Sequence, residues 1–357
     1  MRFSIHVHIQ QQRNHSVQLT EREFLTTHPG QPDSAATQPL AMPRIPGRRP
    51  PRTTLEALVL LTRAEATLAL VMPVLVGAVL GWWQTGQSNL VNLGLALLGM
   101  AANGWGLAAL WEYHDYRYSQ RPGARPIADP IATAYGVMGR GLVAPHTVRD
   151  VGRILLVIGG VCSLWLALLA GWPILFFSGL SFIVVWAVIL LPARYGYRGW
   201  GLGEVAIWLG MGALPLLTGY FGQAGSISLL PVWAGGAFGL FSVLLFFNYN
   251  AIHYRRDWLI HKRTLTVNLG LPRALDVTVI LTVTVYVLIL LLVTLSHLPL
   301  WGLAALGALP VALGVFSRLD HNNLTSDACW WVYRTSVHAT WLTGVLFSAG
   351  LALDQLL

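Results

Sequence analysis

Four long stretches of this sequence contain no Asp, Glu, Lys or Arg, and this distribution constrains the fold more than any other feature. The stretches are 66–111, 154–193, 205–252 and 277–317. Each is about twice as long as the roughly 20 apolar residues that one membrane-spanning helix needs. Each also has uncharged turn-forming residues near its midpoint, such as Gly171-Trp172-Pro173. Each stretch therefore predicts a pair of helices joined by a short turn.

A further apolar segment, about 335–353, predicts a single last helix and brings the expected number of helices to nine. Because basic loops stay in the cytoplasm, we expect a cytoplasmic N-terminus and a C-terminus on the opposite side of a bacterial cytoplasmic membrane. Backbone groups in hydrocarbon must pair within their own segment. The sequence therefore predicts an all-α, polytopic membrane protein.

The N-terminal part of the chain has a different character. We expect residues 1–55 to form a polar, disordered cytoplasmic extension, because they lack the apolar core of a signal peptide. Residues 56–357 then form one membrane domain. The net charge of +8 follows from basic residues beside membrane spans, so it does not indicate a nucleic-acid partner. The two cysteines, Cys162 and Cys329, provide no disulfide framework.

Two of the expected cytoplasmic segments are rich in ionisable groups, and each begins where an even-numbered helix emerges. The first segment carries Glu112, Asp115, Arg117 and Arg121, and the second carries Asn250, His253, Arg256, Asp257, His261, Lys262 and Arg263.

Helical spacing predicts how these groups face one another. Glu112 and Asp115 are three positions apart and share one helix face, while His253, Asp257 and His261 are four apart and form one stripe. Two polar faces opposed at the membrane surface suit a substrate with a charged head and an apolar tail. Carboxylates would bind Mg²⁺, and Arg or Lys would bind phosphate oxygens. The alternative is a pair of solvated loops whose charge only anchors the topology.

Several segments resemble a known family. Residues 112–117 resemble an N-D-Y-x-D-Y-x-x-G-x-D element, and residues 262–270 resemble a G-K-R-T-L-A-V-R-L-G element. Residues 61–63, 136–145 and 212–215 add matches in the same order. Over roughly 57–355 the chain resembles the UbiA superfamily of intramembrane prenyltransferases. It is most similar to the 1,4-dihydroxy-2-naphthoate polyprenyltransferase branch of menaquinone biosynthesis.

This resemblance implies a bundle around a central cavity and the transfer of a prenyl or polyprenyl chain from its diphosphate to an aromatic quinone precursor, with Mg²⁺ bound by both acidic motifs. It implies catalytic and metal-binding roles for Glu112, Asp115 and Asp257, with His253 as a further candidate ligand. The residues expected to bind diphosphate are Arg117, Arg121, Asn250, Arg256, Lys262 and Arg263.

The acidic motifs depart from the family pattern, and the departures keep other functions open. Trp111, Arg121 and His253 stand where the family has Asn or Asp, and Glu112 replaces an Asp. One alternative is a catalytically degenerate subunit of a respiratory or photosynthetic membrane complex, which would hold a quinone, pigment or lipid. Another is a transition-metal site, because imidazole with carboxylate suits Zn, Mn or Fe.

Overall fold

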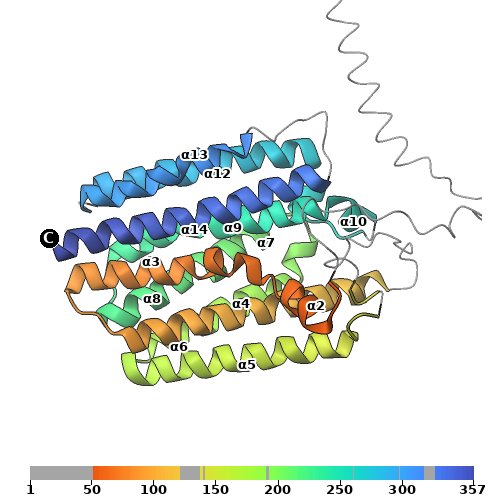
Figure 1. Cartoon of the computed structure of the whole chain (residues 1–357), viewed down its shortest axis with the longest axis horizontal. Helices are drawn as coiled ribbons and strands as arrows, with labels where there is room; N and C mark the ends of the chain where they lie inside the picture. The colour runs from red at the N-terminus through yellow and green to blue at the C-terminus, as the bar shows by residue number, and fades with distance from the viewer. Residues whose placement is uncertain are drawn as a thin grey trace, which may run out of the picture. The chain divides into compact units, whose positions relative to one another are not determined.

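A computed structural model describes residues 51–120, 137–139, 141–189, 193–259, 261–296, 298–316 and 326–357. The long helices run alongside one another and the C-terminus lies at one end of the bundle (Figure 1). Across the described ranges every regular element is helical, apart from an isolated bridge between Arg198 and Arg263. The predicted all-α fold is confirmed.

The longer helices are α3 (Thr67–Thr85), α4 (Leu90–Ser119), α5 (Pro145–Ala170), α6 (Pro173–Ile189), α8 (Leu214–Ala224), α9 (Leu229–Ile252), α12 (Leu271–Leu295) and α14 (Ser326–Leu356). The shorter elements are α2 (Thr54–Leu61), η1 (Ala64–Ala66), η4 (Tyr195–Tyr197), α7 (Leu202–Ile207), a π-helical segment η5 (Trp208–Ala213), α10 (Tyr254–Leu259), α11 (Leu265–Leu269), η6 (Leu300–Ala308) and α13 (Leu309–Leu313).

Turn chemistry ends the helices where the sequence predicts. Gly86 follows α3 with a φ of 69°, and Gly225 follows α8 with a φ of 65°. Glycine adopts this left-handed conformation without a steric penalty, which makes it a common helix C-cap. After Gly86, the Asn89 side chain caps α4 by accepting bonds from the backbone N–H groups of Val91 and Asn92.

Seven helical stretches in the described ranges are long and apolar enough to cross a membrane. They include α7, η5 and α8 as one continuous stretch, Leu202–Ala224. Two further apolar helices are shorter, namely Pro173–Ile189 and Leu300–Leu313. These seven stretches and two shorter helices lie where the nine spans are expected, but the number nine remains a prediction. The predicted extension 1–55 falls mainly on residues outside the described ranges.

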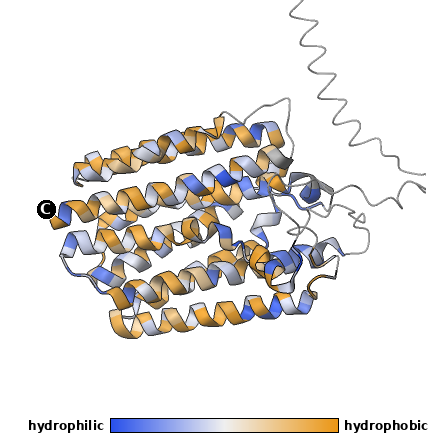
Figure 2. Cartoon of the chain, in the orientation of Figure 1, coloured by the Kyte–Doolittle hydropathy of each residue, from blue (hydrophilic) through white to orange (hydrophobic). Residues whose placement is uncertain are grey.

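The distribution of hydropathy along the bundle is the one expected for helices surrounded by lipid. Apolar residues cover most of the helix lengths, and hydrophilic residues gather mainly near one end of the bundle (Figure 2). Helix α5 carries exposed apolar side chains such as Leu168, which is 78% exposed, and Trp165. Exposed apolar surface on a helix of this length is what a lipid-facing position requires. The chain is an integral membrane protein.

Helices α3 and α8 pack with their backbones in direct contact. A Cβ atom added at Gly77 would lie 2.0 Å from the carbonyl oxygen of Leu216. One added at Gly219 would lie 2.2 Å from the carbonyl oxygen of Val74. Small residues allow such close approach and are typical of helix packing in membranes.

The π-helical segment η5 changes the hydrogen bonding between its neighbours. The Ser181 hydroxyl of α6 donates to the carbonyl oxygen of Gly210. The Ser242 hydroxyl of α9 donates to that of Met211 at 3.0 Å. Carbonyl groups of a π-turn thus bond to side chains of two other helices, which fixes α6 and α9 on either side of the segment.

Candidate functional site

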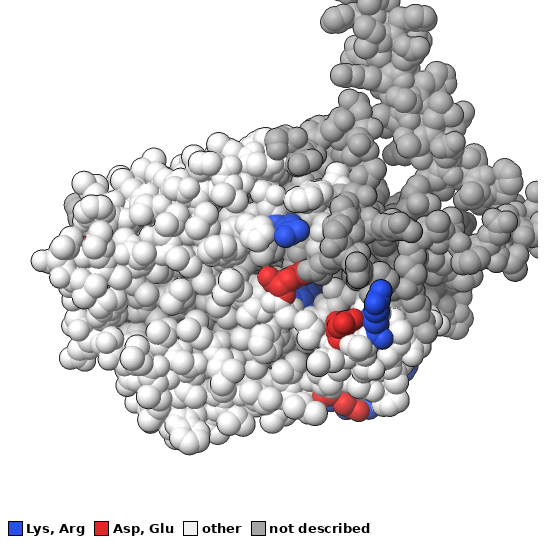
Figure 3. Space-filling model, viewed as in Figure 1, with Lys and Arg blue, Asp and Glu red and all other residues white. Residues whose placement is uncertain are grey.

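On the face seen in Figure 3, charged side chains are confined to one part of the bundle surface and most of that surface is uncharged. A further group of ionisable side chains lies buried where α4 and α9 end. Helix α4 continues past the uncharged stretch and ends at Ser119. Its last turns therefore carry Glu112 and Asp115 on one face. Both carboxylates are buried, with exposed fractions of 1% and 2%. Burial of charged groups at these levels requires partners, because an unpaired charge in a low dielectric is very costly.

Asp115 has three partners from distant parts of the chain. Its Oδ2 accepts a hydrogen bond from Arg256 Nη2 at 2.7 Å and from Lys262 Nζ at 2.8 Å. Its Oδ1 accepts one from the Tyr197 hydroxyl. Asp257, the second acid, accepts a bond from Arg256 Nε at 2.7 Å and lies 3.7 Å from Lys262 Nζ. Arg256 and Lys262 therefore join the two carboxylates.

A tight turn after α10 brings Lys262 back to Asp257. The backbone N–H of Lys262 donates to the carbonyl of Asp257 at 2.7 Å, and His261 has a left-handed φ of 57°. The expected single stripe of His253, Asp257 and His261 is wrong, because α9 ends at Ile252 and α10 ends before the turn. His253 is buried, whereas the His261 side chain is exposed.

Glu112 belongs to a second group of contacts on the same face of α4. It accepts a bond from Arg63 Nη2 at 3.2 Å and one from the Tyr249 hydroxyl at 2.5 Å. The Arg63 guanidinium also lies 3.5 Å from the centre of the Tyr249 ring, a cation–π geometry. The indole of Trp111 separates the two groups, since its ring centre is 5.9 Å from the Arg63 guanidinium and 5.5 Å from Lys262 Nζ.

We call these eight side chains the ion network: Arg63, Glu112, Asp115, Tyr197, Tyr249, Arg256, Asp257 and Lys262. With its carboxyls ionised, the network has three negative and three positive charges. These charges balance within the ion network without any added ion. A fourth cation, the Arg194 guanidinium, lies outside the network at 5.6 Å from the Tyr197 ring.

Unpartnered polar atoms concentrate in and beside the ion network. Buried side-chain atoms without a hydrogen bond include Arg63 Nε, Glu112 Oε2, Asn250 Nδ2, His253 Nδ1 and Asp257 Oδ2. Buried polar groups in native proteins are nearly always satisfied by protein, water or ligand. Their presence near one end of the bundle indicates a place where a polar ligand or water completes the structure.

His253 is held neutral at this position. Burial lowers its pKa well below the usual value, and the positive charges of Arg256, Arg63 and Lys262 lower it further. Its ring packs edge-on against Tyr249, with ring centres 4.6 Å apart. A proton added to His253 would introduce a buried positive charge beside three others.

Acid is therefore expected to destabilise the protein through His253. Above the unfolded-state pKa of about 6.5, His253 is neutral in both states. As the pH falls below this value, the unfolded chain binds a proton that the folded chain excludes, so stability decreases until the folded-state pKa is reached. A His253→Gln variant should lose less of its thermal stability between about pH 7 and about pH 5 than wild type. His146→Gln, which alters an exposed histidine, should retain the wild-type profile; equal profiles for all three proteins would contradict this assignment.

An apolar cavity adjoins the ion network inside the bundle. It has a volume of about 110 Å³, and its wall includes Arg63, Trp111 and Tyr249 together with apolar residues such as Leu245 and Phe246. The cavity is polar at Arg63 and Tyr249 and apolar along the rest of its wall. This division matches a ligand with a polar head and a hydrocarbon tail. Binding sites are typically apolar with a few convergent polar groups.

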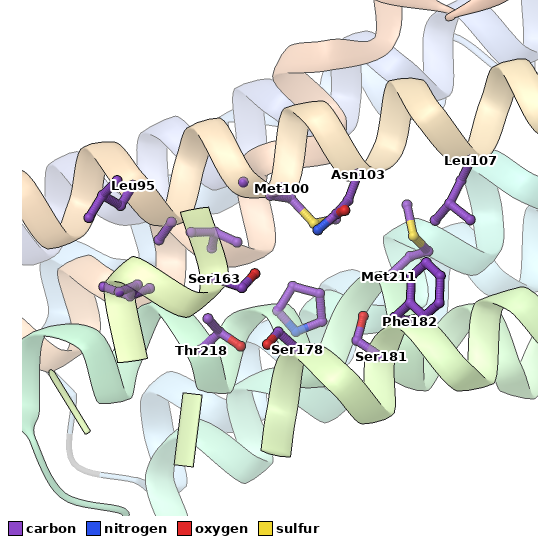
Figure 4. A pocket seen from close by; sticks show the side chains of 15 residues that line it. Leu95, Met100, Asn103, Leu107, Ser163, Ser178, Ser181, Phe182, Met211 and Thr218 are labelled. Carbon is purple, nitrogen blue, oxygen red and sulfur yellow. The ribbon is translucent and has the colours of Figure 1, made fainter. Parts of the chain in front are cut away.

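A second cavity of about 50 Å³ lies among α4, α5, α6 and α8. Figure 4 shows Asn103, Ser163, Ser178 and Thr218 around it. Leu107 and Met211 line both cavities and therefore form the partition between them.

The structure brings most of the predicted site residues together. Glu112, Asp115, Arg256, Asp257 and Lys262 belong to the ion network. Asn250 and His253 are buried beside Tyr249.

The remaining predicted residues lie elsewhere. Arg117 and Arg263 have exposed side chains, and Arg121 lies outside the described residues. The catalytic, metal-binding and diphosphate-binding roles remain predictions for every residue of the set.

Four residues in or beside the ion network are absent from the predicted set, namely Arg63, Tyr197, Tyr249 and Arg194. Tyr197 and Arg194 belong to a segment that is short and poor in charge, and Arg63 was only part of a resemblance. Arg63 and Arg194 both have a left-handed backbone, with φ of 55° and 43°. Non-glycine residues in this conformation are uncommon and often mark functional positions, but the signal exists only in three dimensions.

The carboxylates do not fit a Mg²⁺ ion as they stand. Both oxygens of Asp115 accept bonds from the chain itself, and Glu112 and Asp257 each leave one oxygen without a hydrogen bond. Within the described ranges, no group of three or more His, Cys, Asp or Glu side chains is placed to hold a metal ion. Mg²⁺ needs near-octahedral oxygen coordination, which this donor set does not provide.

Comparisons with known proteins agree with the architecture. Residues 70–341 match the model of the UbiA prenyltransferase family. A UbiA homologue from Archaeoglobus fulgidus bound to DMAPP and Mg²⁺ has a TM-score of 0.52 and 15% identity, covering 82% of this chain and 99% of that one. The homologue bound to GPP and Mg²⁺ has a TM-score of 0.53 and 14% identity, with the same coverage.

A further structure of that homologue has a TM-score of 0.54 and 14% identity, covering 84% of this chain and 99% of the other. At this identity the structural similarity concerns the fold alone. No curated protein sequence matches the chain.

Proposed function

The chain belongs to the UbiA prenyltransferase family, and on this premise we propose that it transfers an isoprenoid chain from its diphosphate to an aromatic quinone precursor in the membrane. The observation that carries this proposal is the ion network with its unpartnered donors at the polar end of an apolar cavity. An isoprenoid diphosphate has the same division into a charged head and a hydrocarbon tail. The related archaeal structures contain DMAPP or GPP, which supports this substrate class.

The transfer divides into two bond changes. The allylic C–O bond breaks with its electron pair going to the diphosphate. The aromatic ring then forms a C–C bond to the allylic cation and loses a proton to solvent. Arg63 and Lys262 would pair with the departing diphosphate. The π faces of Trp111 and Tyr249, which line the cavity, would stabilise the cation.

Turnover by the purified full-length protein tests this proposal. Detergent-solubilised protein, incubated with farnesyl or geranylgeranyl diphosphate and a dihydroxynaphthoate, should yield a prenylated product detectable by mass spectrometry. Reactions with Mg²⁺ and with EDTA should be run in parallel. Absence of product from every donor and acceptor pair, in protein that remains folded, would contradict the proposal.

A second candidate is a noncatalytic subunit that holds a quinone, pigment or lipid in a respiratory or photosynthetic complex. The favouring observation is that every carboxylate of the ion network already pairs with a cation of the chain. Copurification with such a complex, a bound isoprenoid lipid and no turnover would favour this function. Recovery as a free active enzyme would exclude it.

The partition between the cavities is expected to limit the length of the isoprenoid tail. Met211→Trp adds bulk where the first cavity meets the second, so a long tail loses room while a short one does not. We expect at least about a tenfold fall in turnover with geranylgeranyl diphosphate and little change with dimethylallyl diphosphate. Leu168→Trp, on the exposed face of α5, is the matched control. An equal loss for both donors would contradict a role in length selection.

A further inference from the structure

The ion network occupies the oxygen atoms that a divalent metal would need. Asp115 Oδ2 accepts two bonds, from Arg256 and Lys262, which fills both of its lone-pair positions. Asp115 Oδ1 accepts the Tyr197 hydroxyl. A metal could bind through Oδ2 only by displacing a buried cation whose other partner is the second carboxylate, Asp257. Oδ1 keeps one lone-pair position beside the Tyr197 hydroxyl, and a single oxygen is far short of the coordination that Mg²⁺ needs.

Charge balance also opposes a metal. The three acids and three cations of the ion network cancel, so a divalent ion bound without an anion would leave two uncompensated positive charges in a buried region. Arg194 beside Tyr197 increases this repulsion. Buried charges are tolerated when they are paired. A buried charge that has no partner of opposite sign is costly.

The departures from the family pattern remove ligands at the same place. Trp111 supplies an aromatic ring near Arg63 and Lys262 instead of an amide oxygen. His253 is buried beside the network and carries no carboxylate. The two carboxylate oxygens that accept no hydrogen bond, Glu112 Oε2 and Asp257 Oδ2, belong to different groups of the network.

The unpartnered donors suit an anion instead. Arg63 Nε and Asn250 Nδ2 are buried N–H donors without an acceptor. The Lys262 ammonium has three donors, and Asp115 accepts one of them at hydrogen-bond distance. A phosphate group supplies the oxygen acceptors that these donors lack.

We propose that this protein binds its diphosphate without a divalent metal ion, with Arg256 and Lys262 as the fixed counter-cations of Asp115 and Asp257. The identity of the anion as an isoprenoid diphosphate rests on the proposed function. The expected weak binding of a divalent metal does not rest on the proposed function, because it follows from contacts within the chain.

Metal binding and anion binding are measured separately on the full-length protein in detergent. Mn²⁺ binding is followed by electron paramagnetic resonance, with and without farnesyl thiodiphosphate, after subtraction of the signal from Mn²⁺ and analogue alone. Binding of the analogue is followed by calorimetry in EDTA and in Mg²⁺. We expect no protein-bound Mn²⁺ and dissociation constants that agree within about twofold.

Stoichiometric Mn²⁺ in the protein, or analogue binding at least about tenfold tighter in Mg²⁺, would overturn the inference. Failure of the analogue to bind in either medium would overturn the proposed function and the anion half of the inference. The Mn²⁺ signal would still test the other part of the inference, that the protein does not bind a divalent metal.

A variant gives the complementary result. Lys262→Gln removes one positive charge and frees a lone pair on Asp115, so it should gain Mn²⁺ binding and lose about tenfold in metal-free affinity for the analogue. Arg153→Gln makes the same charge change at a side chain that is 63% exposed, and should behave as wild type. Lys262→Arg keeps the charge and should also exclude Mn²⁺, which provides a test if the glutamine variant does not fold. Folded Lys262→Gln without Mn²⁺ binding would count against the inference.

Discussion

Replacing Asp115 by alanine is expected to lower the free energy of unfolding by about 3–5 kcal/mol, the range for removal of one partner from a buried ion pair. Arg256 and Lys262 would lose their shared acceptor and remain buried, with exposed fractions of 3% and 1%. The Tyr197 hydroxyl would also lose its acceptor. Any prenyl transfer should disappear with the geometry of the ion network.

Unfolding in mixed micelles by a denaturing detergent, followed by circular dichroism, measures this loss. Asp150→Ala removes an acid from an exposed ion pair with Arg149 and should change stability little. Asp115→Asn keeps the shape and should retain more stability than the alanine variant. An Asp115→Ala protein as stable as wild type would show that these contacts contribute little to the folded state.

Replacing Gly77 by alanine is expected to destabilise the protein by about 3 kcal/mol, at the upper end of the range for overpacking. The added methyl group would meet the carbonyl of Leu216 at 2.0 Å, and backbone cannot move aside as a flexible side chain can. The helices α3 and α8 would have to separate. Because only the short element η1 separates Arg63 from α3, this change should also disturb the contact between Arg63 and Glu112.

The same unfolding assay, together with a proteolysis time course, tests the Gly77 prediction. Gly94→Ala is the matched control, since a Cβ atom at this position of α4 would meet nothing within 4 Å. Alanine is a better helix former than glycine, so the control should be neutral or up to about 1 kcal/mol more stable. If both variants behave alike, the close approach of α3 and α8 does not limit stability.

The sequence predicted best what depends on local periodicity. Glu112 and Asp115 share a face because α4 remains helical beyond the uncharged stretch, and helix spacing alone places residues three apart on one side. The meeting of Asp115 with Asp257 was expected from the topology, which places both charged segments on the same side of the membrane, and from the family resemblance, because nothing local relates positions so far apart. The expected stripe through His261 failed where the helix gives way to a left-handed turn.

The partners of the carboxylates could not be predicted in this way. Tyr197 reaches Asp115 from a loop whose course depends on the left-handed conformation of Arg194, and composition does not encode that conformation. The pairing of Arg63 with Glu112 depends on the turn between α2 and α3. A motif shows which side chains are available, whereas their pairing is decided by the packing of the whole bundle.

The ion pairs of Asp115 span 141 and 147 residues of sequence, and this separation has a consequence for biogenesis. The first half of the chain leaves the ribosome with a carboxylate at the end of α4 whose neutralising cations have not yet been synthesised. Ionisable groups are costly in a bilayer, so this end of α4 stays hydrated until the second half arrives. Pairing of this carboxylate therefore waits for the synthesis of Arg256 and Lys262, and a product truncated before them would keep an unpaired acid at the end of α4.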